Sequence, residues 1–246
     1  MSIALNAASA SWQSSTGAIV VTLPSYAAGD LGIIFYGTKP FDADASIDQT
    51  WNTGGTYTSG TNASGIDSGS MKCIVYWKIL TASETGPTIS SATNSVSGAV
   101  CYVFRATSGY QFLSPADCGG SDISAGTGIS ITGGSNPGLA AGDVLAASAA
   151  FNTDASGDIT AHAFSATGCT FGSVTNNPST DLATASGQDM GQTACYAAVS
   201  TGPSSAAPVF TCTAAGSVGE AAGAMVRIRE EVIPEATESP MPFIGG

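Results

Sequence analysis

The chain has 246 residues, of which only 10% are charged, against about 25% in an average soluble domain. Its 18 acidic and 6 basic residues give a net charge of −12. So few cationic side chains cannot neutralise the phosphates of a nucleic acid. No apolar segment is close to the length of about 18 residues that a membrane span needs. We therefore expect neither a nucleic acid nor a membrane as partner.

The first half of the sequence consists of short apolar segments separated by turn residues. Segments 18–23, 31–38, 72–80 and 98–106 are rich in β-branched and aromatic residues and are bounded by Gly, Pro, Asn, Asp or Ser. This pattern predicts β-strands. We interpret FLSPADCGGSDISAG, residues 112–126, as a connection to the second half.

The second half continues in the same way. Its predicted strands are 129–132, 143–151, 194–199, 209–213 and 223–229. The alanine-rich segment DVLAASAAF at 143–151 is ambiguous, because alanine also suits a helix. Its neighbours favour a strand, and one helical turn remains an alternative.

A nine-residue phrase occurs twice, as LPSYAAGDL at 23–31 and NPGLAAGDV at 136–144. We interpret Ala-Ala-Gly-Asp (AAGD) as a tight turn, in which glycine takes a positive φ and aspartate accepts hydrogen bonds from nearby amides. A loop that contacts a ligand is the alternative. The flanking strands recur in the same order, which indicates two copies of one strand plan.

The predicted fold is therefore all-β. It has two pseudo-repeated antiparallel sandwich halves, jelly-roll or immunoglobulin-like, each long enough for about seven strands. The expected divisions are 1–111 for the first copy, 112–126 for the connection, 127–230 for the second copy and 231–246 for an extended C-terminal arm.

Residues suited to catalysis are scarce. His162 is the only histidine and no G-x-S-x-G elbow occurs, which argues against a catalytic triad. Glu84 and Glu220 are the glutamates of the β region, and both lie in turn-like contexts. The six cysteines form no C-x-x-C pair, so we expect no zinc site and mostly buried free thiols, with disulfides left open. We predict a protein that is not an enzyme and needs no cofactor.

Two acidic loops are candidates for calcium, since oxygen-bearing side chains at alternate positions suit a hard cation. Ordinary solvated turns are the alternative. The candidate ligands are Asp42, Asp44 and Asp48 in the first loop and Asp154 and Asp158 in the second.

Two further features suggest contacts with other molecules. Trp51 and Tyr57 lie in or near a loop and could form an aromatic platform for a glycan, or instead cap the core. The C-terminal segment 230–246 holds three prolines and four glutamates and ends in apolar residues. We expect it to contact a neighbouring chain through Met241, Phe243 and Ile244, with folding back on its own sandwich as the alternative.

The order of several motifs resembles the β-sandwich modules of tailed-bacteriophage virion proteins and related bacterial surface proteins. The matching residues are Pro24, Ala27 to Asp30, Trp51, Tyr76-Trp77-Lys78, Glu84, Tyr102 and Arg105. The resemblance covers most of the first copy and fades in the second, which has neither the Trp nor the Tyr-Trp-Lys. It implies a jelly-roll-like module for virion assembly or surface attachment, with no catalytic residues.

These observations lead to one expectation of function. The chain would be a non-enzymatic virion structural protein, most simply a capsid decoration protein that forms homo-oligomers and contacts other virion proteins. Its start lacks the basic region and apolar core of a secretory signal. We therefore expect synthesis in the host cytoplasm and release by lysis. The alternative is a tail-associated protein that binds a receptor or glycan.

Overall fold

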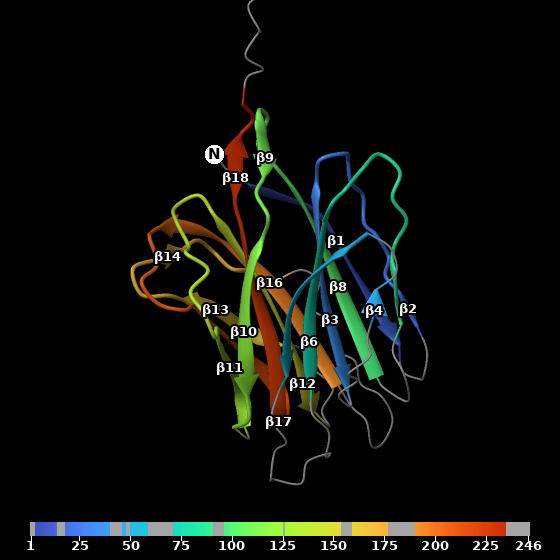
Figure 1. Ribbon diagram of the computed structural model, residues 1–246. Helices are drawn as coiled ribbons and strands as arrows, with labels where there is room; N and C mark the ends of the chain where they lie inside the picture. The colour runs from blue at the N-terminus through green and yellow to red at the C-terminus, as the bar shows by residue number, and fades with distance from the viewer. Residues whose placement is uncertain are drawn as a thin grey trace, which may run out of the picture.

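The computed structural model describes residues 3–13, 18–39, 46–47, 50–58, 71–90, 96–124, 126–153, 159–176 and 190–234. Within these residues the chain forms eighteen β-strands and no helix, and the paired strands run antiparallel (Figure 1). The prediction of an all-β antiparallel fold is confirmed.

The first half of the chain builds a five-stranded sheet and a small three-stranded sheet that packs on it. The large sheet has the order β1 (Ala4–Gln13), β8 (Val96–Arg105), β3 (Leu31–Lys39), β6 (Lys72–Ile79), β5 (Asn52–Thr58). The small sheet has the order β2 (Ile19–Val20), β7 (Thr88–Ser90), β4 (Ser46–Ile47).

Strand β3 explains why its sequence, LGIIFYG, is apolar throughout. Successive side chains of a strand point to opposite faces of the sheet. Ile34 and Tyr36 pack towards the small sheet, while Ile33 and Phe35 pack towards the second half of the molecule. Both faces are buried, so the strand lacks the polar positions of a half-exposed strand.

The second half forms another large sheet and a further outer layer. The large sheet has the order β10 (Ala116–Asp122), β17 (Val209–Ile228), β12 (Val144–Thr153), β16 (Met190–Thr201), with β14 (Thr170–Phe171) and β15 (Thr175–Asn176) on β16. Residues 209–213 of β17 leave this sheet and pair with β11 (Gly126–Thr132) and β13 (Thr160–Ser165). A second core cluster fills the space between these two layers.

The two large sheets face each other and share the largest core. Phe35, Val75 and Tyr102 from the first half pack in one cluster with Ala146 and Ala224 from the second. The alanine-rich segment is strand β12, buried along its whole length, so the strand interpretation is confirmed. Its small side chains allow the two sheets to approach closely.

Several details differ from the sequence-based prediction. Residues 112–126 are more than a connection, because they contain β10, an edge strand of the second large sheet. Segment 209–213 and residues 223–228 of the second segment belong to the single strand β17, and β1 and β5 were not predicted. The two large sheets have equivalent strand orders, in which β8, β3 and β6 of the first correspond to β17, β12 and β16 of the second. The division of the chain into two copies stays a prediction.

Candidate interaction site

The two AAGD turns are built by the same hydrogen bonds. The amide of Ala27 donates to Asp30 Oδ2 over 2.7 Å, and the amide of Ala140 donates to Asp143 Oδ2 over 2.8 Å. Gly29 and Gly142 have φ angles of +89° and +92°, in the region that favours glycine. The interpretation of the phrase as a turn is confirmed.

Each turn is tied to the end of a neighbouring strand by an arginine. Arg105 donates from Nε and Nη2 to the two carboxylate oxygens of Asp30, over 2.9 and 2.7 Å. Arg229 makes the same two bonds to Asp143, over 2.7 and 2.6 Å. The carboxylates are buried, and the hydrogen bonds to them raise the pKa of each arginine. The aspartates are therefore part of the structure rather than free ligands.

A short two-stranded ribbon lies beside the turns. It is formed by β9 (Tyr110–Phe112) and β18 (Glu230–Val232), which connect the end of the first half with the end of the described chain (Figure 1). Glu230 accepts bonds from the amide and hydroxyl of Thr107, both over 2.8 Å, and the amide of Ile233 donates to the carbonyl of Gly109 over 3.0 Å. The first residues of the predicted arm are thus held by the first half of the same chain.

A cleft of about 490 Å³ opens between the first AAGD turn and this ribbon; we call it the pole cleft. It is lined by the turn residues 27–30, by Ile79, by residues 105–112 and by Ile233. Ile79 and Ile233 are 38% and 49% exposed, and Val232, which precedes Ile233 in the chain, is 62% exposed. The second turn has a smaller hollow of about 160 Å³, which the turn residues 140–143, Arg229 and Glu230 line. The pole cleft is therefore a partly apolar surface open to solvent.

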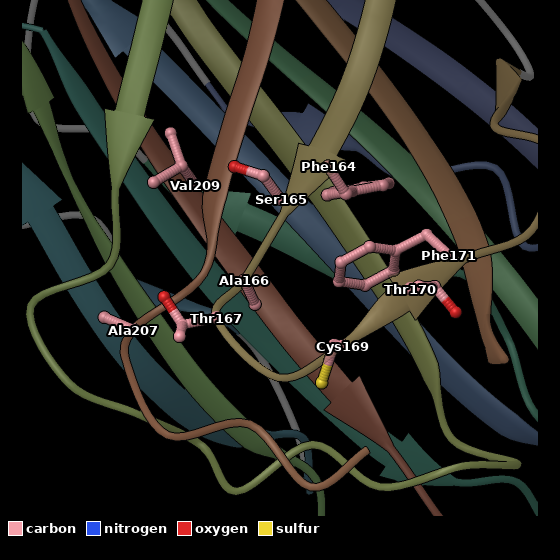
Figure 2. A pocket seen from close by; sticks show the side chains of 9 residues that line it. All are labelled: Phe164, Ser165, Ala166, Thr167, Cys169, Thr170, Phe171, Ala207 and Val209. Carbon is pink, nitrogen blue, oxygen red and sulfur yellow. The ribbon is translucent and has the colours of Figure 1, made fainter. Parts of the chain in front are cut away.

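A second concave site, the aromatic pocket, lies where the outer layer of the second half meets strand β14 (Figure 2). Its volume is about 430 Å³, and the rings of Phe164 and Phe171 lie side by side with centroids 5.6 Å apart. The hydroxyl-bearing residues Ser165, Thr167 and Thr170 also line it. No charged residue is among its lining residues, so it suits a neutral ligand.

Trp51 and Tyr57 do not form a surface platform. Trp51 is only 7% exposed and packs in the core between the first two sheets, against Gly32. The hydroxyl of Tyr57 donates to Asp117 Oδ2 over 3.1 Å, and burial and this carboxylate raise the pKa of the tyrosine. Trp51 is part of the core, as the alternative interpretation stated. Tyr57 joins β5 to β10.

The predicted calcium ligands Asp42, Asp44, Asp48, Asp154 and Asp158 lie outside the described residues, as do the arm residues Met241, Phe243 and Ile244. One neighbour of the second loop is described. Asn152 is buried, and its side-chain oxygen accepts a hydrogen bond from Lys39 Nζ over 2.9 Å. Among the residues that the structure describes, no group of three or more His, Cys, Asp or Glu side chains could hold a metal ion.

His162 is half-buried and has no acidic partner among the contacts described. Its Nε2 lies 2.8 Å from Thr193 Oγ1, its ring stacks on Phe210, and burial lowers its pKa. The six cysteines are all free thiols and all but Cys169 are buried, as predicted for most of them. Burial raises the pKa of the Cys73 and Cys101 thiols to about 12.

Sequence reasoning missed the two Asp–Arg pairs, the β9–β18 ribbon, the pole cleft and the aromatic pocket. The available signal for the pairs was an arginine at or just after the end of a long strand in each half, Arg105 at the end of β8 and Arg229 just after β17. The pairing of β9 with β18 joins residues more than a hundred positions apart and left no signal in the sequence.

Comparison of the chain with protein-family models, with curated proteins and with solved structures gave no match. In the part of the chain that the structure describes, no helix is long and apolar enough to span a membrane.

Proposed function

We propose that this chain is a non-enzymatic structural protein of a bacteriophage virion, a capsid decoration protein on the particle surface. The observation that carries the proposal is the distribution of exposed apolar side chains. Of the five large apolar residues exposed among those described, Ile79 and Ile233 line the pole cleft, and Val232 is the chain neighbour of Ile233. Scattered apolar residues are ordinary on a surface, whereas a gathered set indicates contact with another protein.

The body that carries this surface supports the same role. Four β-layers with three core clusters form a rigid support, and the described chain leaves this support at the pole, next to the cleft. A rigid body with a terminal segment at its contact surface suits attachment to a lattice of virion proteins. The partners are then further copies and other virion proteins, with synthesis in the host cytoplasm and release by lysis.

Particle incorporation tests this function. Phage particles purified after lysis should contain the chain, and deletion of residues 235–246, which leaves β18 intact, should lower its amount at least tenfold. Val20→Asp is the matched control, because Val20 is 66% exposed on the small sheet of the first half, away from the pole cleft. A chain absent from purified particles would refute the proposal.

The aromatic pocket favours a second candidate, a tail-associated protein that binds a receptor glycan. Aromatic rings pack against the apolar faces of sugars, and hydroxyl groups can bond sugar hydroxyls. Hits on a glycan array that Phe171→Ala weakens at least tenfold, and that Val20→Ala leaves unchanged, would favour adhesion over decoration. An array without hits would remove this candidate.

A further inference from the structure

We propose that the C-terminal segment 235–246 of one copy occupies the pole cleft of a second copy. This inference rests on the proposed assembly role and names the partner surface of the arm. It assigns each molecule one donor segment and one acceptor cleft.

The end of the ribbon fixes where the segment starts and how far it can reach. Val232 is the last residue of β18, Ile233 makes one more bond to Gly109, and Pro234 follows. Proline has no N–H to extend the ladder, and the residue before a proline favours extended conformations. Both effects end the β9–β18 ladder at Ile233, which itself lines the pole cleft, so the segment starts at the surface that it would contact in a second copy. Twelve extended residues span at most about 40 Å, enough to reach a neighbour.

The chemistry of the cleft matches that of the segment. Ile79 and Ile233 offer exposed apolar surface beside Phe112 at the cleft wall, and the segment carries Met241, Phe243 and Ile244. Burial of apolar surface supplies the attraction. The Arg105 side chain, which is paired with Asp30, is 47% exposed at the same cleft and can attract Glu235 and Glu238 of the segment. An ion pair at an exposed site contributes little to affinity, so this attraction mainly orients the segment in the cleft.

Among the described residues, the corresponding hollow at the second turn is a smaller acceptor. Its volume is about 160 Å³ against about 490 Å³, and its apolar side chains are alanines, where the pole cleft has Ile79, Phe112 and Ile233. It therefore offers less apolar surface to the segment. One acceptor per chain produces a head-to-tail contact, which closes into a ring or continues as an open array.

Self-association of the full-length chain tests the inference by sedimentation velocity between 1 and 100 µM. The full chain should self-associate. Deletion of 235–246 removes the donor and Ile79→Glu disables the acceptor, so each should weaken association at least tenfold. Val20→Glu, an equally polar change at an exposed apolar residue remote from the cleft, should leave it unchanged. Ala28→Glu, on the exposed turn, is a second acceptor variant in case Ile79→Glu disturbs folding.

Mixing the two defective proteins provides the decisive comparison. The deletion variant keeps its cleft and Ile79→Glu keeps its segment, so together they should form a one-to-one dimer that neither forms alone. A full chain that stays monomeric at 100 µM, or a mixture that stays monomeric, would overturn the inference. Particle incorporation is measured separately, so a chain that self-associates but is absent from particles would refute the virion role alone.

Discussion

Arg105 and Asp30 form a two-point ion pair that fastens the first AAGD turn to the end of β8. Asp30 immediately precedes β3 and Arg105 ends the adjacent strand β8, so the pair connects two neighbouring strands at the same end of the sheet. Arg229 and Asp143 repeat this geometry in the second half. The recurrence shows what the repeated phrase does in the structure. Its aspartate accepts a hydrogen bond from the turn amide and forms an ion pair with the arginine.

Removal of either carboxylate should therefore destabilise the fold. We expect Asp30→Ala and Asp143→Ala each to lower the free energy of unfolding by about 2–3 kcal/mol, because a turn amide and an arginine lose a buried acceptor. Urea denaturation measures the change. Glu231→Ala is the control, an exposed acid bonded to Gln111, and should cost less than about 0.5 kcal/mol. Equal effects at all three positions would contradict this interpretation.

The close approach of the two large sheets makes a second prediction. A Cβ at Gly37 would lie 2.6 Å from Ala150 Cβ, whereas a Cβ at Gly128 meets nothing within 4 Å. We expect Gly37→Ala to destabilise the protein by about 1–3 kcal/mol through overpacking. Gly128→Ala should be neutral or slightly stabilising. Melting curves of the two variants test the difference, and a reversed order would show that the sheets do not meet at Gly37.

Thiol accessibility provides a third prediction. Cys169 is partly exposed in the aromatic pocket, while the other five cysteines are buried. A maleimide should label one thiol per native chain and six after denaturation. Because burial raises the pKa of Cys169, labelling should be slow at neutral pH and faster at higher pH. Cys169→Ser should abolish native labelling, and rapid labelling of a second thiol would contradict the described core.

The single histidine makes the pH dependence directly measurable. Burial holds the pKa of His162 below its ordinary value of 6.5 in the folded state. As pH falls, the His162 side chain therefore takes up its proton in the unfolded chain before it does so in the folded protein. The contribution of His162 to the free energy of unfolding is greatest above about pH 6.5 and declines as pH falls towards the lowered folded pKa. NMR titration of the imidazole checks the pKa, and His162→Gln should remove this part of the decline. A folded pKa above 6.5 would refute the prediction.

Much of the strand content could be predicted from local sequence. LGIIFYG and KCIVYWKI have the continuous apolar character of strands buried on both faces, and they became β3 and β6. Gly29 and Asp30 identified the turn because a positive φ and a carboxylate acceptor are local requirements. The candidate interaction sites could not be predicted from local sequence. Trp51 occupies the core because sheet pairing places it beneath Gly32, which no local pattern records.

The sequence by itself determined the secondary structure type, the two AAGD turns and the burial of most cysteines, because these depend on side-chain type and on neighbours within a few residues. Only the tertiary structure decided that the two halves share a core, that β18 pairs with β9, and that Ile79 and Ile233 meet at one cleft. Those contacts join residues far apart in the chain. Their formation depends on how whole sheets pack, which is a property of the assembled layers and not of any single segment.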